Sequence, residues 1–487
     1  MQRSHQDADT PARHVVVIGG GIAGLAAAHR LVATGLRVTL LEATDRLGGK
    51  LMTGEVAGVQ VDLGAESMLA RRPEAVSLAG EVGLTDRLRP PATATASLWT
   101  REALRPMPKG HVMGVPADPA ALDGVLSAEG LARIAEDRHL TPTPVGDDVA
   151  VGAYVADRLG REVVDRLVEP LLGGVYAGDA YRISMRAAVP QLFEAVREGG
   201  PLLEAVRRIQ ERAAARQQTG PVFQGIEGGI GTLPGAVGDA VRAAGGRILT
   251  ETPVLGLTRT ATGWAVRTDT GVITADGIVL ATPAWSASAL LAADSPAASA
   301  ELAGVEYASM ALVTLAFRRT DIEGYEALRG RSGFLVPPVD GRTIKASTFS
   351  SNKWQWVADS APGLFVLRTS VGRYGEEEHL HREDGELVAV SLRDLRAATG
   401  LAARPVDSEV TRWIGGLPQY PVGHHTRVAR IRDEVAKLPA LRVCGAVYDG
   451  VGIPACVASA RRAADEITEE IIATPTLVRG TGSEAGQ

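Results

Sequence analysis

The first glycine-rich turn of the chain has the residue types and spacing that bind the phosphates of a dinucleotide. A β-branched apolar run at 14–18 precedes Gly19-x-Gly21-x-x-Gly24, and an alanine-rich helical stretch follows it. Gly19 permits a tight turn, Gly21 has no Cβ and lets a pyrophosphate approach the backbone, and Gly24 lets the helix pack closely on the strand. The helix N-terminus would then offer unpaired N–H groups and a positive dipole end to the phosphates.

An acid lies where a ribose would be recognised. The second apolar strand ends at Glu42, close to the offset of roughly 20 residues at which a carboxylate accepts hydrogen bonds from a ribose 2′-OH. This acid favours FAD or NAD over NADP. Ile22, Ala23 and Ala43 flank the glycine turn and the acid, and we expect them, together with Lys50, to contact the cofactor.

A second glycine turn comes directly behind Glu42. It reads Arg46-Leu-Gly48-Gly49-Lys50. Two adjacent glycines allow the backbone to approach a second phosphate or a ribityl chain, and Arg46 would supply the counter-charge. A solvated surface arginine is the simpler interpretation of Arg46 alone, but its place behind the ribose acid favours a role at the cofactor.

A third glycine-rich loop lies near the C-terminus. An apolar strand at 441–444 leads into Gly445, then into Val451-Gly452-Ile453 and a helix that extends to about residue 472. The loop and the helix start form a second set of backbone N–H donors. Donors and a helix dipole aimed at a bound cofactor would stabilise negative charge that develops there.

Several further elements must position these loops. An amphipathic helix is expected at 74–88, a mostly helical block at 111–220, and four short β-branched strands between 247 and 281. Longer strands follow between 310 and 369 and again at 406–413. A helix at about 383–399 interrupts them. We expect these longer strands to form an antiparallel sheet in the substrate domain.

Composition excludes several classes of protein. The chain has 487 residues, enough for two or three domains, and its net charge of −6 gives no general attraction for nucleic acid. Two cysteines, without a His/Cys cluster at ligand spacing, argue against a disulfide scaffold or a metal site and fit a reduced, cytoplasmic setting. No apolar run is long enough to span a membrane, and the polar first residues are unlike a signal peptide. Peripheral membrane contact and oligomeric state stay open.

Three motifs are more specific than the glycine turns. They are EPLLGGVYAGD at 169–179, WIGGLPQYPVG at 413–423 and GAVYDGVGIPAC at 445–456. Together with the Arg46 turn, and in this order, they resemble the FAD-dependent protoporphyrinogen and coproporphyrinogen oxidases of the amine oxidase superfamily. The resemblance covers nearly the whole chain and is nearest to the Gram-positive bacterial branch, which acts on coproporphyrinogen III.

The resemblance implies an α/β fold, α+β overall. It would combine a Rossmann-type FAD-binding domain, an antiparallel-sheet substrate-binding domain and a helical insertion. The FAD-binding domain would be discontinuous, at 14–73, 222–296 and 424–473. The substrate-binding domain would take 74–110 and 297–423, and the helical domain 111–221, with disordered tails at 1–13 and 474–487.

The resemblance also assigns further contacts to FAD. Residues 64–67 resemble the family's GPES segment beside the flavin, with Ala65 in place of proline. Val254 would lie against the adenine, and the C-terminal loop would cap the flavin pyrimidine ring. The full set of additional contacts is Gly64, Ala65, Glu66, Ser67, Val254, Thr282, Trp413, Gly445, Val451, Gly452 and Ile453. Cys444 lacks the usual flavinylation context, so the FAD would be non-covalent.

Substrate contacts are expected from Arg71, Val175, Tyr176 and Lys345. Arg72 and Arg342 are further cations that could meet carboxylates. We name no catalytic base, because a histidine pair such as His424-His425 at a loop-to-helix junction more often caps a helix or faces solvent.

The expected reaction is the six-electron oxidation of coproporphyrinogen III to coproporphyrin III in haem biosynthesis, with O₂ as acceptor and H₂O₂ as by-product. Product hand-off to a ferrochelatase stays open. The alternatives are protoporphyrinogen IX oxidation, an amine oxidase or carotenoid desaturase on the same fold, and a non-enzymatic escort protein without flavin. An aromatic content of 4% argues against an amine-binding cage, and the intact Arg46 turn argues against the escort protein.

Overall fold

The computed structural model describes residues 12–141, 143–215 and 220–473. The tails predicted at 1–13 and 474–487 therefore lie outside the described residues, apart from Ala12 and Arg13. Within the described ranges, no helix is both long and apolar enough to cross a membrane. In the same ranges, no group of three or more His, Cys, Asp or Glu side chains is placed to hold a metal ion.

A parallel sheet carries the first and third glycine loops. Among the described residues its five strands lie in the order β12 (Arg247–Leu249), β2 (Arg37–Leu41), β1 (His14–Ile18), β16 (Gly277–Leu280) and β22 (Leu441–Val443). These strands come from distant parts of the chain, and all pair in parallel register. This arrangement confirms the Rossmann-type α/β prediction.

The two faces of this sheet are covered differently. One apolar core joins the sheet to α1 (Ile22–Val32), α2 (Pro73–Glu81), α10 (Leu233–Ala243) and α17 (Ile453–Ala473). The other core joins it to the antiparallel meander β13 (Val254–Thr260), β14 (Gly263–Thr268) and β15 (Val272–Ala275), and to α11 (Ala284–Leu291), α12 (Pro296–Ala303) and α16 (His424–Val435). Full burial of β1 explains why its sequence is apolar at consecutive positions.

The second sheet is mixed. In the part of the chain that the structure describes, seven strands follow the order β21 (Asp407–Pro418), β17 (Tyr307–Arg318), β20 (Leu364–Val371), β19 (Ile344–Thr348), β18 (Gly333–Leu335), β7 (Ala96–Thr100) and β8 (Ala103–Pro106). Neighbours pair antiparallel, except that β18 runs parallel to β7. The antiparallel prediction is therefore correct for most of the sheet, and α15 (Asp384–Thr399) covers one face.

The segment between the strands β8 and β11 (Phe223–Ile226) is mostly helical. It contains α3 (Ala128–Ala135), α4 (Val151–Leu159), α6 (Glu169–Tyr176), α7 (Met185–Ala188), α8 (Pro190–Arg197) and α9 (Leu202–Ala215). These helices share their own apolar core. A buried ion pair lies inside it, with Arg158 Nη2 at 2.6 Å from Asp137 Oδ1.

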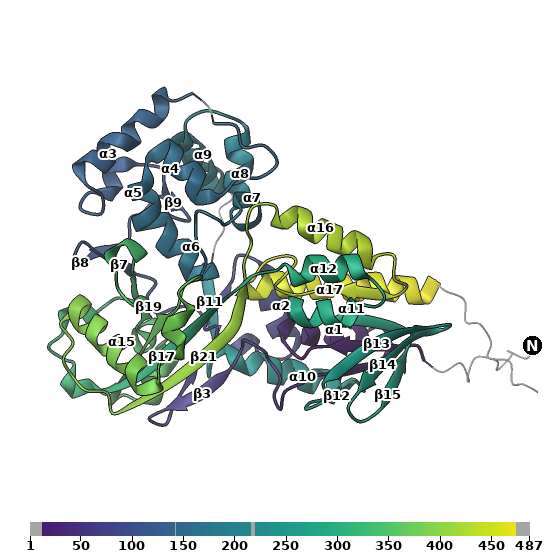
Figure 1. The fold of residues 1–487 in the computed structure, drawn as a ribbon. Coiled ribbons are helices and arrows are strands. Elements are labelled where there is room, and N and C mark those ends of the chain that lie inside the picture. The colour runs from purple at the N-terminus through teal and green to yellow at the C-terminus, as the bar shows by residue number, and fades with distance from the viewer. Residues whose placement is uncertain (1–11, 142, 216–219, 474–487) are drawn as a thin grey trace, which may run out of the picture.

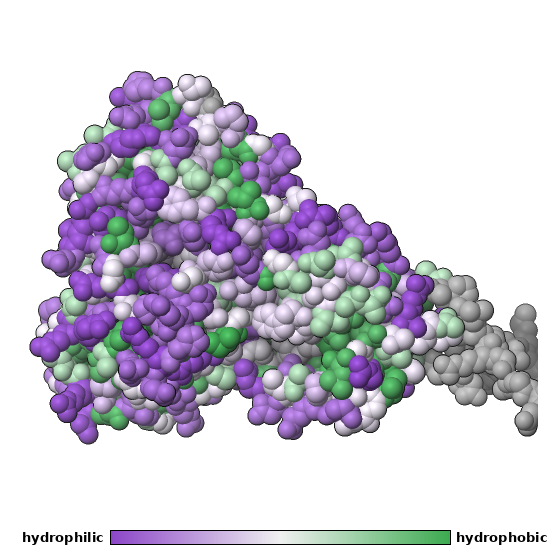
Figure 2. All heavy atoms as spheres, viewed as in Figure 1, coloured by the Kyte–Doolittle hydropathy of each residue, from purple (hydrophilic) through white to green (hydrophobic). Residues whose placement is uncertain are grey.

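Figure 1 shows how these parts are arranged. The helical segment forms the upper lobe, the mixed sheet with α15 the lower left, and the parallel sheet with α1 and α17 the lower right. On the face shown in Figure 2, hydrophilic residues cover most of the upper lobe, while more apolar residues gather over α11 and α12. The parallel sheet, the mixed sheet and the helical segment each have apolar cores of their own, and the domain boundaries given above remain our proposal.

Candidate cofactor and substrate site

The glycines of the first turn are placed as their spacing predicts. Gly19 has φ +108°, and a Cβ on it would lie 2.6 Å from the Ala281 carbonyl oxygen. A Cβ on Gly24 would lie 1.8 Å from the Gly19 oxygen. A Cβ on Gly21, in contrast, would meet nothing within 4 Å. Gly19 and Gly24 are therefore required for close packing, whereas Gly21 leaves open space at the start of α1.

The N-terminus of α1 is uncapped. Gly21 is its N-cap residue, no side chain caps it, and its first turn carries no acid. The first N–H groups of a helix have no partner within the helix. Ile22 and Ala23 are buried directly behind this end. An uncapped helix end beside open space fits the phosphates of a dinucleotide.

Glu42 is already bound to the backbone of the glycine turn. Its Oε2 accepts a hydrogen bond from the Gly20 N–H at 2.6 Å, and its Oε1 accepts one from the Thr44 N–H at 2.9 Å. Oε1 also accepts from the Thr44 hydroxyl at 2.8 Å, so Oε2 is the oxygen that can accept a further bond. Ala43, between these residues, is exposed. The Thr252 N–H donates to the Glu42 carbonyl at 2.8 Å, which brings the start of β13, and thus Val254, beside the acid.

The second glycine turn lies on the first. The Gly48 N–H donates to the Gly20 carbonyl at 2.9 Å, and a Cβ on Gly49 would lie 3.4 Å from Gly21 Cα. Arg46 Nη2 donates to the Gly49 carbonyl at 2.7 Å. Arg46 therefore shapes this turn, and its guanidinium also lies 5.8 Å from the centre of the Trp413 ring.

Lys50 connects these turns to the C-terminal loop. It is exposed, yet burial lowers the pKa of its amine, and Cys456 in α17 acts on it electrostatically. Gly452, at the start of α17, is also exposed, whereas Gly445 and Ile453 are buried and Val451 is half-buried.

The segment 63–67 forms the next wall of the site. A Cβ on Gly64 would lie 2.1 Å from the Lys50 oxygen and 3.2 Å from Trp413 Cζ2. Trp413 Nε1 donates to the Leu63 carbonyl at 2.9 Å. Ala65 and Ser67 are half-buried. Trp413, which lies some 350 residues further along the chain, is thus brought to the predicted flavin segment. Thr282, another predicted contact, follows β16 beside Gly19, and its hydroxyl is buried with no partner among the described residues.

Glu66 makes contacts that the sequence did not predict. Its Oε1 lies 2.5 Å from Lys353 Nζ and its Oε2 lies 3.3 Å from Arg368 Nη2. Burial alone would raise the pKa of Glu66, but Arg368 and Lys353 outweigh that effect and lower it. Arg368 also donates to the Gly64 carbonyl at 2.7 Å. The carboxylate therefore anchors its segment to the mixed sheet. In the sequence, the one signal for these ion pairs was a glutamate in a glycine-rich apolar segment, because a buried acid requires a cation as partner.

The predicted substrate residues do not all gather. Val175 is 43% exposed at the end of α6, and Lys345 is 8% exposed in β19, against which α6 packs. Arg71 lies exposed in the turn before α2, where no hydrogen bond or ion pair joins it to the described residues. Arg72 pairs with Glu74 at 3.0 Å, and Arg342 lies over the Trp99 ring at 4.8 Å. Neither of these two cations contacts Lys345.

Tyr176, predicted to contact substrate, packs against Tyr420. Its ring lies 5.5 Å from that of Tyr420, and burial raises the pKa of its hydroxyl to about 12. Tyr420 in turn stacks on His424, with ring centres 4.2 Å apart. His424 Nε2 bonds to the Val447 carbonyl at 2.9 Å, and burial lowers the pKa of His424 to about 4. His424 is thus part of a packed stack, whereas His425 is exposed.

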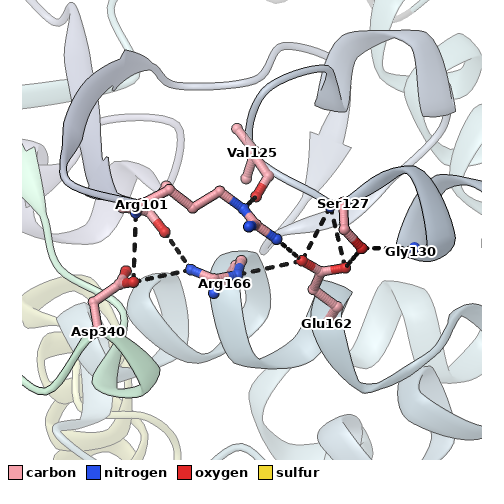
Figure 3. A network of polar contacts seen from close by, with 8 residues as sticks. Arg101, Val125, Ser127, Gly130, Glu162, Arg166 and Asp340 are labelled. Carbon is pink, nitrogen blue, oxygen red and sulfur yellow. Dashed lines mark hydrogen bonds and ion pairs between the residues drawn. The ribbon is translucent and has the colours of Figure 1, made fainter.

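A polar network fixes the helical lobe on the mixed sheet (Figure 3). Arg166, just before α6, donates to Thr100 Oγ1 at 2.7 Å and to Asp340 Oδ1 at 3.0 Å. Glu162 lies 3.4 Å from Arg166 Nε, accepts from the Ser127 hydroxyl at 2.7 Å and pairs with Arg101. The network holds α6 over the sheet, and sequence patterns gave no signal for it.

The parallel sheet, the uncapped helix over open space and the paired glycine turns define a dinucleotide-binding fold. Comparison with known proteins shows to which family of dinucleotide-binding proteins the chain belongs. The model of the flavin containing amine oxidoreductase family matches residues 22–468, and the chain belongs to that family. Its cofactor is accordingly a flavin.

Individual relatives are similar over nearly their full length. The chain is 38% identical to the coproporphyrinogen III oxidase of Mycobacterium leprae, over 94% of this chain and 99% of that protein. It is 31% identical to the Bacillus subtilis coproporphyrinogen III oxidase, over 93% of this chain and 97% of that protein. The bovine protoporphyrinogen oxidase is 29% identical, over 93% and 98%.

Solved structures agree with this fold. A putative protoporphyrinogen oxidase from Exiguobacterium sp. 255-15 is similar with a TM-score of 0.84 and 32% identity, over 95% of this chain and 100% of that one. Cyclohexylamine oxidase from Brevibacterium oxydans is similar with a TM-score of 0.70 over 95% and 100%, but at 19% identity it shows the fold alone.

Proposed function

We propose that this protein is an FAD-dependent oxidase that converts coproporphyrinogen III to coproporphyrin III in haem biosynthesis. The observation that carries the proposal is the similarity, over nearly the full length, to coproporphyrinogen III oxidases at 38% and 31% identity. The substrate loses six electrons and six protons, and three O₂ molecules accept them as three H₂O₂.

FAD would be held non-covalently by the residues around the three glycine loops. The N–H groups at the start of α1 would meet its pyrophosphate and Glu42 its adenosine ribose. Glu66, whose carboxylate is occupied by Lys353 and Arg368, would position the backbone of Gly64, Ala65 and Ser67 instead of binding directly. When bound, the flavin supplies the two-electron acceptor for each oxidation step.

The chain's own residues would position the porphyrinogen and exclude water. Trp413 and the 64–67 backbone form one wall, and α6 with Val175 forms another above the mixed sheet. The substrate gains aromaticity and its meso C–H bonds are activated by pyrroles. Accordingly, no paired acid and base is assigned, and the buried, packed His424 supports that choice.

Protoporphyrinogen IX is the second candidate substrate. The similarity to the bovine protoporphyrinogen oxidase favours it, although at lower identity. The two substrates differ in carboxylate number, four against two, so discrimination would depend on cations at the site.

Anaerobic reduction of the bound flavin by each porphyrinogen tests the proposal. Coproporphyrinogen III should bleach the flavin absorbance rapidly, and air should restore it with release of H₂O₂. Reduction by protoporphyrinogen IX alone would replace the proposal with the second candidate. A purified protein without flavin absorbance would contradict both.

A further inference from the structure

Lys345 is a buried amine without a carboxylate partner. Its residue is 8% exposed, and its Nζ lies 3.9 Å from Met310 Sδ, its only hydrogen-bond contact among the described residues. A thioether is a weak acceptor, and burial of an unpaired ammonium group is strongly unfavourable. A methionine at this position would pack without that penalty. The lysine therefore needs an explanation other than stability.

A β-bulge directs this side chain. In the pairing of β19 with β20, Ile344 lies opposite Val371 and Ala346 lies opposite Ser370, so Lys345 is the extra residue. Bulges change the direction of a side chain and are frequent beside active sites. Ile344 packs in the core under α15. Lys345, the next residue, instead contacts Met310, which is not part of that core.

The face that Lys345 reaches is the one that carries the site. Met310, which contacts its amine, lies opposite Trp413 in the β17–β21 pairing. Trp413 binds the Leu63 carbonyl beside the predicted flavin segment. From the other side, α6 packs against β19. Lys345 thus lies between the wall made by Trp413 and the helix that carries Val175.

The charges around Lys345 leave a positive excess. Arg373 is also buried, and it donates to the carbonyls of Val336 and Arg342 and to Glu376 Oε2 at 3.3 Å. Glu376 is thus bound to Arg373, although it acts on Lys345 electrostatically.

The other elements packed around Lys345 do not supply the missing anion. The acid of α6 is Glu169, which accepts from the Ala180 N–H at 2.6 Å; burial raises its pKa to about 7, and Arg373 acts on it electrostatically. Asp165 and Asp179 beside it accept from Tyr181, and Asp340 pairs with Arg166. From α15, the buried Asp394 accepts from the N–H groups of Thr343 and Ile344 and lies 3.3 Å from Arg393 Nε. Each of these carboxylates is engaged by another group, and none of them bonds to Lys345 Nζ.

We propose that Lys345 binds a carboxylate of the porphyrinogen, and that its amine takes up one proton from solvent as the complex forms. The proposal rests on the proposed function, because it assumes a porphyrinogen carrying propionates. No bond to carbon forms or breaks: the carboxylate stays ionised, and the proton gained by Nζ is released again when the product leaves.

The pH dependence of binding follows from this coupling. Burial and then the charge of Arg373 lower the pKa of Lys345 to about 7. A bound carboxylate would raise it again. Below pH 7 the amine is already protonated, so this group leaves the affinity unchanged. Above pH 7 the complex must take up a proton, and affinity should fall by up to tenfold for each pH unit.

The test measures binding of coproporphyrin III, the product, to the flavin-loaded protein by fluorescence between pH 6 and 9. Wild type should lose affinity above pH 7 as stated. Lys345→Met should bind at least tenfold more weakly at pH 6.5 and lack the slope, and it should unfold at a higher temperature. Lys345→Arg, which stays charged, should retain binding without the slope. Lys437→Met is the matched control, because Lys437 is exposed and pairs with Glu434.

Two outcomes separate this inference from the proposed function. If Lys345→Met keeps wild-type affinity and slope while wild type is reduced by coproporphyrinogen III, only the role of Lys345 is wrong. If wild type neither binds coproporphyrin III nor is reduced by coproporphyrinogen III, the proposed function itself fails. Should Lys345→Met not fold, Lys345→Arg decides alone: an unchanged slope above pH 7 overturns the inference.

Discussion

Gln419 Nε2 donates a hydrogen bond to the Tyr176 carbonyl at 2.8 Å, across 243 residues of sequence. The bond joins the two motifs that carried the resemblance, 169–179 and 413–423. The Ser184 N–H also donates to the Tyr420 carbonyl at 2.8 Å, and the Tyr176 and Tyr420 rings are in contact. The two motifs therefore contact each other directly, and their residues serve this packing as well as any ligand.

Replacement of Gln419 should loosen this junction. Gln419→Leu leaves the buried Tyr176 carbonyl without its donor, which costs about 1–3 kcal/mol of unfolding free energy. Urea denaturation should show this loss, with flavin content retained at saturating FAD. Gln355→Leu is the control, since Gln355 is exposed and bonds to Asp359. Equal stability of the two variants would mean that the Gln419 bond adds nothing.

Local patterns predicted the parts of the fold that local physics determines. The unit from β1 to Glu42 could be predicted from its sequence because Gly19 and Gly24 each leave no room for a side chain, while Gly21 keeps the start of α1 open. The helix expected at 74–88 ends earlier, at Glu81, because Gly83 adopts φ +80° and the chain turns. The parallel pairing of β18 with β7 joins residues more than 200 positions apart, and no periodicity in either strand indicates it.

The glycine turns of the site could be predicted from the sequence, whereas the ion pairs between its side chains could not. Gly21, Gly48 and Gly49 lie together as expected, since glycine is required at close approaches. The cations that neutralise Glu66 come from β20 and the segment after β19, so only the tertiary structure reveals them. Arg71 and Lys345 looked equivalent as cations, yet one is exposed and the other buried.

Gly21 gives a direct test of the cofactor site. Gly21→Leu should fold, because no atom lies within 4 Å of the new Cβ, but its side chain would fill the space over the start of α1. We expect flavin content below a tenth of wild type, measured by absorbance, with an unchanged far-ultraviolet circular dichroism spectrum. Gly235→Leu, at an equally open position in α10, should keep its flavin. Wild-type flavin content in Gly21→Leu would contradict this assignment.

Glu66 should give the protein a specific sensitivity to acid. Its pKa in the folded state lies below the ordinary 4.5, so its stabilising contribution is complete above pH 4.5 and is lost as the pH falls through the lowered value. Glu66→Gln should lose about 3–5 kcal/mol at pH 7, because Lys353 and Arg368 are left buried without a counter-charge. Its stability should also fall less steeply below pH 4.5. Glu55→Gln, at an exposed position in β3 (Thr53–Val56), should follow wild type.

Arg166 is the residue through which the helical lobe is held over the sheet (Figure 3). Its side chain is 15% exposed and bridges Glu162 to Asp340 and Thr100. Arg166→Met removes these charge-assisted bonds, each worth about 1.5–3 kcal/mol, and leaves two carboxylates facing the gap. We expect faster amide hydrogen exchange at 161–176 and a KM for porphyrinogen raised several-fold with kcat nearly unchanged, because our proposal gives α6 a role in positioning substrate and none in the chemical step. Arg197→Met, which removes an exposed pair with Glu194, should alter neither quantity. A fall in kcat without a change in KM would show that the lobe acts on the chemical step instead.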